Sequence, residues 1–313
     1  MNLLAPQFTD ADKAREYLEN IRWPDGPACP HCGDTKAYTI TRKKEGAKTR
    51  KGLYKCAGCR KQYTVTVGTV FEGSKVPLNK WLLASYLIAS SKKGFSAHQL
   101  HRSIGVTYKT TWFMFHRLRE AMTDDFMRTT LGGEGKVVEA DETYWGNNRT
   151  KGVKPRAGGG HKEKVFALVE RNGNVRSFHI PTVTAKTLGP ILTEQVDKET
   201  RLMTDEHKAY KTPGKQFKSH ETVAHSLKEY ARGDISTNTI EGVFSLLKRG
   251  LHGSYHHVAP EHLHRYLAEF DFRYNRRDTS DSERTDALLA NAEGKRLTYR
   301  RPAAQNHGTQ QIG

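Results

Sequence analysis

The sequence predicts a mixed α/β protein in which a small cysteine-rich module and an all-helical segment precede a larger domain of strands and helices. Three observations lead to this prediction. All four cysteines fall between residues 29 and 59, residues 77–122 repeat apolar side chains at helical spacing, and short strands alternate with amphipathic helices from about residue 137. The expected segments are an N-terminal helix over 1–21, a ribbon over 22–72, a helical module over 77–125, an α/β domain over 135–280 and a disordered tail over 291–313.

The cysteine pattern predicts one structural zinc ion. The four thiols form two Cys-x-x-Cys pairs with twenty-three residues between them: Cys29, Cys32, Cys56 and Cys59. Four thiolates satisfy tetrahedral zinc, so His31 is not needed as a ligand. The alternatives, a redox pair or unpaired thiols, are less favoured because a redox motif needs a single pair. From Lys36 to Lys61 ten Lys or Arg stand against one Glu, which favours contact with phosphate over a merely solvated hairpin tip.

Residues 77–122 have the order of a helix-turn-helix. Ser96 is suited to cap a first helix, Gly105 marks a turn, and Thr107 is suited to cap a second helix. The residues at the start of this second helix occupy the position from which a recognition helix contacts DNA: Lys109, Thr110 and Thr111. A helical hairpin that serves packing alone would show the same pattern, and the basic ribbon beside it favours DNA binding.

Charge and hydropathy restrict the classes of function. Fifty-one Lys and Arg against thirty-four Asp and Glu give a formal net charge of +17. No run approaches the roughly 18 apolar residues of a membrane-spanning helix, and residues 1–17 lack the basic-then-apolar order of an export signal. Membrane and secreted proteins are therefore excluded, and we expect a cytoplasmic, nucleoid-associated protein with a polyanionic partner.

The α/β region has the element order of a ribonuclease-H-like mixed sheet. The expected strands are 137–145, 164–169, 175–180 and 201–205, and the expected helices are 184–196, 238–250 and 259–277. Asn172-Gly173 is a strong hairpin signal between the second and third strands. A basic, glycine-rich stretch, 146–160, follows the first strand and is either a linker or a clamp.

Three carboxylates lie on three separate elements of this order. Asp141 lies on the first strand, Asp205 ends the fourth, and Glu241 lies on the helix that follows. Carboxylates so placed can converge to hold two Mg²⁺ ions about 3.5–4 Å apart, with Mn²⁺ able to substitute. Such a pair of ions activates the attacking oxygen and stabilises the leaving oxygen at phosphorus, which is phosphodiester chemistry.

Three sequence blocks carry a resemblance to a known family. Ala140-Asp-Glu-Thr-Tyr-Trp-Gly146, Thr204-Asp-Glu-His-Lys-Ala-Tyr210 and Asn238–Arg249 resemble the blocks of bacterial insertion-sequence transposases with an ISXO-like DDE domain. With the ribbon and the helices, the resemblance covers roughly residues 15–280. It implies an enzyme that cuts double-stranded DNA at the inverted repeats of its element and joins the 3′ ends to target DNA. It also implies a homo-oligomer assembled on paired DNA ends.

The third metal ligand stays open between two residues. Members of the family differ at this position, where some have Asn, and this sequence has both Asn238 and Glu241. A carboxylate binds Mg²⁺ more tightly, and Lys248 lies two helical turns along the same face as Glu241, where it would hold a DNA phosphate together with Arg249. The structural alternative is a capping box, in which Asn238 caps the helix and the Glu241 side chain accepts a hydrogen bond from the backbone N–H of Asn238.

Other polar and aromatic residues in the blocks have simpler interpretations. Glu142 and Glu206 directly follow the two aspartates, so they point to the opposite face and we expect them to contact solvent. His207 is a candidate for a supporting or DNA-contacting role. Tyr144 and Trp145 are more often packing residues than base-stacking ones at a strand end.

The favoured function is a DNA transposase with Mg²⁺-dependent strand transfer. The alternatives are a DNA-binding regulator without catalysis and a nuclease that hydrolyses nucleic acid without joining it. Mg²⁺-dependent nicking separates the first alternative from the enzyme, and joined products separate the second.

Overall fold

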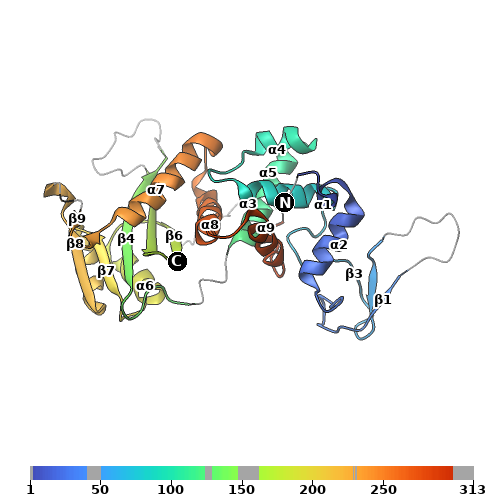
Figure 1. Ribbon diagram of the computed structural model, residues 1–313, viewed down its shortest axis with the longest axis horizontal. Coiled ribbons are helices and arrows are strands. Elements are labelled where there is room, and N and C mark those ends of the chain that lie inside the picture. The colour runs from blue at the N-terminus through green and yellow to red at the C-terminus, as the bar shows by residue number, and fades with distance from the viewer. Residues whose placement is uncertain are drawn as a thin grey trace, which may run out of the picture.

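The computed structural model describes residues 3–40, 51–123, 129–146, 162–227, 229 and 231–298. The basic hairpin tip, most of the stretch 146–160 and the last part of the tail lie outside the described residues. The ribbon lies at one end of the molecule, the large sheet at the other, and helices lie between them (Figure 1).

The N-terminal part consists of two helices and a small antiparallel sheet. Its elements are α1 (Pro6–Thr9), α2 (Ala11–Arg22), β1 (Ala37–Thr39), β2 (Tyr54–Cys56) and β3 (Gln62–Tyr63), with strand order β1-β2-β3. Asp10 caps α2 by accepting hydrogen bonds from the backbone N–H groups of Asp12 and Lys13. The edge of Trp23 packs on the rings of Tyr54 and Tyr63, which attaches the sheet to the helix.

The helical module forms where its caps predict it. Its helices are α3 (Leu78–Ser90), α4 (Ala97–Ile104) and α5 (Tyr108–Met122). Ser96 accepts a hydrogen bond from the Gln99 N–H, and Thr107 accepts one from the Thr110 N–H, as the sequence predicts. Gly105 ends α4 at φ +61°, a left-handed conformation that favours glycine.

The C-terminal end of the described chain returns to this module. Helix α9 (Asp281–Ala290) was not predicted; it begins with a capping box between Ser280 and Glu283 and packs on α3. Residues 291–298 were expected to be disordered, but Ala292 is buried and its carbonyl accepts a hydrogen bond from the N–H of Val70. One continuous hydrophobic cluster therefore joins α2, the ribbon, α3, α5 and α9.

The α/β domain contains a mixed sheet of five strands in the order β6-β5-β4-β7-β8. Its strands are β4 (Val137–Trp145), β5 (Glu163–Glu170), β6 (Val175–Ile180), β7 (Arg201–Asp205) and β8 (Ser219–Val223). Strands β4, β5 and β6 pair antiparallel, whereas β7 is parallel to β4 and to β8. The first four strands match the prediction. Strand β8 was missed because Ser-His-Glu-Thr-Val shows no apolar alternation.

Helices cover both faces of this sheet. Helix α6 (Ala185–Gln195) packs on one face, and α7 (Asn238–Gly250) and α8 (Leu263–Asn275) pack on the other (Figure 1). Short elements connect them: η2 (Lys208–Tyr210), η3 (Pro213–Gln216), η4 (His225–Leu227), β9 (Ala231–Arg232), β10 (Ile235–Ser236), the π-helix η5 (Leu251–Tyr255) and η6 (Pro260–His262). None of the helices in the described part of the chain is both long enough and apolar enough to cross a membrane.

Helix α5 packs directly on α8, which links the helical module to the α/β domain. Within this interface His116 is 1% exposed, and its ring contacts Trp112 at 4.0 Å and His262 at 4.7 Å between centroids. Burial, and then the charge of Arg119, lowers the pKa of His116 to about 2. The imidazole is therefore neutral in the folded protein at every ordinary pH.

This lowered pKa predicts a loss of stability in acid. The unfolded chain binds a proton below its ordinary pKa of 6.5 and the folded chain does not, so stability falls as pH drops below 6.5. His116 lowers the unfolding free energy by up to about 1.4 kcal/mol for each pH unit below this value. We expect His116→Phe to flatten the decline in urea-unfolding free energy between about pH 6 and 4.5. An equally steep decline in the variant would contradict the assignment.

Candidate functional site

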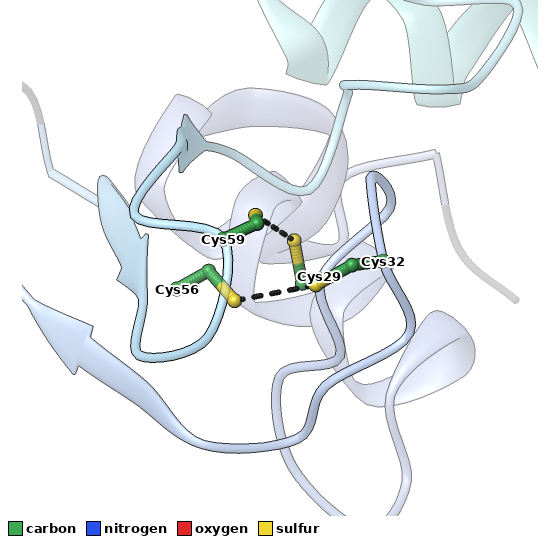
Figure 2. Close-up of side chains that lie close together, drawn as sticks. All are labelled: Cys29, Cys32, Cys56 and Cys59. Carbon is green, nitrogen blue, oxygen red and sulfur yellow. Dashed lines mark hydrogen bonds between the residues drawn. The ribbon is translucent and has the colours of Figure 1, made fainter.

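The four cysteines form a compact cluster between the two knuckles of the ribbon (Figure 2). Their Sγ atoms all lie within 4.8 Å of one another. Those of Cys29 and Cys59 are 3.7 Å apart and those of Cys32 and Cys56 are 3.5 Å apart. Zinc–sulfur bonds of about 2.3 Å in a tetrahedron place the sulfurs about 3.8 Å from each other, so the cluster fits one zinc ion.

Asp34 fixes the two knuckles relative to each other. Its carboxylate accepts hydrogen bonds from the backbone N–H of Lys36 at 2.9 Å, next to the first knuckle, and of Gly58 at 3.0 Å, inside the second. These hydrogen bonds lower the pKa of Asp34 below its ordinary value, although desolvation acts in the opposite direction. Asp34 therefore fixes the two cysteine pairs relative to each other through these backbone N–H groups.

Replacing a ligand should unfold the ribbon. We expect Cys56→Ser to lose the zinc, because binding of a structural zinc contributes roughly 10–16 kcal/mol to folding in small zinc modules. Metal analysis should give one zinc per chain for the wild type and none for the variant. His31→Ala is the matched control and should keep its zinc; zinc loss in this control would show that the four-sulfur set is wrong.

The acidic residues of the α/β domain share one face of the sheet. Ala140 and Thr204 pair on the adjacent parallel strands β4 and β7, so Asp141 and Asp205 are the next residues on neighbouring strands. Glu139 pairs with Met203, and side chains alternate along a strand, so both aspartates point to the face that α7 covers. Glu241 lies in the first turn of α7.

The pKa of Asp141 is raised, in part because other negatively charged groups lie near it. Burial is the largest cause that raises it, the negative charges of Glu142, Asp205 and Glu241 add to this, and the backbone N–H of Glu142 opposes them, so the pKa lies at about 8. Among the described residues, the four cysteines alone form a group of potential ligand atoms that all lie within 4.8 Å of one another, and the three carboxylates do not form a comparable group.

Glu142 and Glu206 have partners that the sequence did not reveal. Glu142 points to the face opposite α7, as expected, but it is half-buried there and accepts a hydrogen bond of 2.5 Å from the buried Tyr210 hydroxyl. The solvent contact expected for Glu142 is therefore only partial, since its carboxylate is also bonded to Tyr210. Glu206 accepts bonds from the N–H and hydroxyl of Ser226 at 3.0 and 2.9 Å. The His207 N–H donates to Asp205 at 3.0 Å.

Glu139 is a buried carboxylate that sequence reasoning missed. Its side chain is fully buried, and it accepts hydrogen bonds from the Ile240 N–H at 3.0 Å and the Thr239 hydroxyl at 2.9 Å. Arg171 pairs with it at 2.6 Å and also donates to Ser236. Glu139 thus holds the N-terminus of α7 against β4, two residues from Asp141. A lone acid inside the apolar run Val-Val-Glu-Ala was the available signal.

Helix α7 begins at a different cap from the one considered in the sequence. Thr237 is the N-cap, its hydroxyl donates to Glu241 at 3.2 Å, and Asn238 is the first helical residue. The capping box with Asn238 as its cap is therefore wrong by one residue. The exposed face of α7 carries Asn238, Glu241, Ser245 and Lys248, so Lys248 does lie on the face of Glu241, and His252 follows in the π-helix η5. The Arg249 guanidinium donates to the Ser245 carbonyl of the same helix.

At the end of β4, Trp145 is buried and its ring packs edge-on against His252 at 4.7 Å between centroids. Its neighbour Tyr144 is 36% exposed. The packing role expected for this pair therefore fits Trp145.

The predicted DNA-contacting residues of α5 differ in exposure. Lys109 is exposed, and Thr110 is half-buried with its hydroxyl 2.9 Å from that of Thr107. Thr111 is fully buried, and its hydroxyl donates to the Ala97 carbonyl at 3.1 Å and the Tyr108 carbonyl at 2.9 Å. Thr111 holds α4 against α5, so it does not belong to the DNA-contacting set.

Comparisons with known proteins match both ends of this arrangement. Residues 130–275 match the ISXO2-like transposase domain, and residues 9–62 match a transposase zinc-ribbon domain. A protein of Halobacterium salinarum described as an uncharacterized protein in transposable element ISH50 is 31% identical over 282 residues. The match covers 85% of this chain and 91% of that protein.

Proposed function

Because this chain belongs to the family of insertion-sequence transposases with a zinc ribbon and an ISXO2-like domain, we propose that it catalyses Mg²⁺-dependent DNA cleavage and strand transfer. Its DNA substrates are the terminal inverted repeats of its own element and a target duplex. The observation that carries this proposal is the convergence of Asp141, Asp205 and Glu241 from β4, β7 and α7 on one face of the sheet.

The domain assignment is part of the proposal. Residues 135–280 form a ribonuclease-H-like catalytic domain, supported by the sheet order in which the first strand pairs with both the second and the fourth. Residues 22–72 form the zinc ribbon, and residues 77–125 form a helix-turn-helix-like module, supported by the two caps and the left-handed Gly105. The net charge of +17 of the whole chain suits it for binding DNA.

The side chains present fit two hard cations with oxygen ligands. Asp141, Asp205 and Glu241 would hold Mg²⁺, and Asn238 offers an amide oxygen on the same exposed face as the runner-up third ligand. The ions, when bound, supply the charge that activates the attacking oxygen and stabilises the leaving oxygen at phosphorus.

The protein's own groups position the reactants. Lys248 and Arg249, exposed near the end of α7, are placed to hold the DNA backbone. The raised pKa of Asp141 means that binding of a cation also requires loss of a proton from this carboxyl group. The active species is proposed to be a homo-oligomer that holds two DNA ends.

Incubation of the protein with an end fragment of its element and a supercoiled plasmid tests the function. We expect Mg²⁺-dependent nicks at the repeat end and covalently joined products. Nicks without joining would favour a nuclease, and sequence-selective binding without any nicks would favour a regulator. Either result would overturn the transposase proposal.

Glu139 should act as a positioning residue for the proposed metal site. We expect Glu139→Gln to raise the Mg²⁺ concentration for half-maximal strand transfer and to lower the maximal rate, because Arg171 loses its buried partner and α7 is less firmly held. Loss of one partner of a buried pair costs about 3–5 kcal/mol, so unfolding is monitored alongside. Glu206→Gln, on an exposed acid of the same domain, is the control. An unchanged Mg²⁺ dependence in Glu139→Gln would contradict this role.

A further inference from the structure

A hollow of about 330 Å³ lies between helices α4 and α5 and the segment that follows α7. Its two walls carry aromatic and imidazole side chains: His98, Tyr108 and Trp112 on the helices, and Tyr255, His256 and His257 on the opposite segment. No Asp or Glu is among the described residues that line it. The exposed Lys92 and Lys93 directly precede its lining residue Gly94 in the chain. This chemistry suits an anionic ligand that has flat rings.

The helix side of the hollow presents rings to solvent. His98 and Tyr108 stack at 4.1 Å between centroids with 18° between their planes, although Tyr108 is 40% exposed. Trp112 follows Tyr108 by one helical turn on α5, so it lies on the same side of that helix. Proteins hold single strands of nucleic acid by stacking successive bases on such rings beside a positively charged path.

The opposite wall is held in a strained turn. His256 has φ +57° and ψ −47°, and the His257 N–H donates to the Tyr255 carbonyl at 2.6 Å. This is a γ-turn with positive φ, a rare and strained conformation for a residue with a side chain. Strain of this kind is found at ligand sites. The turn comprises Tyr255, His256 and His257, three consecutive ring-bearing residues that all line the hollow.

The exposed face of α7 connects the hollow to the acidic cluster. The exposed residues Glu241, Ser245 and Lys248 follow one another along this face, and the exposed His252 continues it in η5. His252 lies eleven positions after Glu241, which is roughly 16 Å along a helix axis. At about 3.4 Å per nucleotide step of a DNA strand, this equals about five steps. A strand cut at the acidic cluster would therefore reach the hollow within about five to seven nucleotides.

We propose that this hollow binds one or two unpaired nucleotides of a DNA strand, with their bases stacked against Tyr108 and Trp112. The volume is at the small end of ligand pockets, about 300–1,000 Å³, so it accepts a base and excludes a duplex. The position of these nucleotides relative to the cut rests on the proposed function, whereas the binding of unpaired bases does not.

Binding of fluorescein-labelled oligothymidylate of ten nucleotides to the full chain, in Mg²⁺-free buffer, tests the proposal by fluorescence anisotropy. We expect Tyr108→Ala to weaken binding by roughly 5- to 100-fold, the effect of losing one stacked base. Tyr108→Phe keeps the ring and should bind as the wild type does. Lys109→Ala, the neighbouring charge control, should lower the salt dependence without removing the stacking contribution.

Crosslinking separates the hollow from other basic surfaces such as the ribbon. With 5-iodouracil in the oligonucleotide, we expect crosslinked peptides that contain Tyr108 and Trp112 or residues 253–257. Equal affinity of Tyr108→Ala and the wild type, or crosslinks confined to other peptides, would overturn the proposal. Neither measurement needs catalysis, so a wild-type protein that never joins DNA would overturn the proposed function and leave this result standing.

Discussion

Asp141→Asn is expected to abolish Mg²⁺-dependent cleavage and joining while DNA binding remains. The proposed ions supply several kcal/mol of stabilisation to the transition state, and each 1.36 kcal/mol is tenfold in rate, so we expect a loss of roughly a thousandfold or more. The neutral amide removes a carboxyl group that burial and three neighbouring acids disfavour in its charged form. The variant should therefore unfold at the same temperature as the wild type or at a higher one.

Two measurements test this prediction. Gel-based assays of nicking and joining report the chemistry, and thermal unfolding in the absence of Mg²⁺ reports the fold. Asp278→Asn is a matched control, because that side chain is 88% exposed and far along the chain from the acidic blocks. Retained Mg²⁺-dependent cleavage in Asp141→Asn would remove Asp141 from the proposed metal site.

Elements with strong local patterns were predictable from the sequence. Strands β4, β6 and β7 and helix α7 have the predicted bounds, because apolar runs and turn signals define them locally. Strand β8 carries polar residues and acquires its structure by pairing with β7, which no local pattern reveals. The order of the tail at Ala292 likewise depends on contacts with residues more than 200 positions earlier.

The residues of the candidate site likewise divide into those that the sequence predicted and those that it did not. Its cysteine cluster was predictable because Cys-x-x-Cys spacing is local, and the positions of the three acidic residues on β4, β7 and α7 were predictable from the order of elements, whereas their role as metal ligands stays a prediction. The supporting residues were not, since Glu139 acts through Ile240, 101 positions away, and Glu142 acts through Tyr210, 68 positions away. The burial of Thr111 was hidden as well, because its hydroxyl bonds to α4 in the folded module.

The interface between the helical module and the α/β domain contains a buried ionic network centred on Glu269 of α8. Glu269 is fully buried and pairs with Arg119 of α5 at 2.7 Å and with Arg273 on its own helix. The Tyr255 hydroxyl also donates to it. Burial by itself would raise the pKa of Glu269, but the charges of Arg273 and Arg119 outweigh burial and hold it below its ordinary value. The carboxylate is therefore ionised at neutral pH.

Glu269→Gln should be among the most destabilising single changes in the chain. It leaves Arg119 and Arg273 buried without a counter-charge, a loss of about 3–5 kcal/mol from a total stability of about 5–15 kcal/mol. Urea unfolding measures this loss. Glu120→Gln is the matched control in the same interface, because its pair with Arg265 is partly exposed and should contribute at most about 1 kcal/mol.

A second variant separates the charge effect from simple loss of packing. If the uncompensated guanidinium groups cause the loss, Glu269→Leu combined with Arg119→Met and Arg273→Met should recover much of the stability, since apolar replacements of buried ion pairs are often neutral or stabilising. Destabilisation by Glu269→Gln no larger than that by Glu120→Gln would contradict the network's role. Arg119 and Tyr255 also line the proposed base-binding hollow. Their bonds to Glu269 therefore fix the hollow relative to α8, and α8 packs on the sheet that carries Asp141.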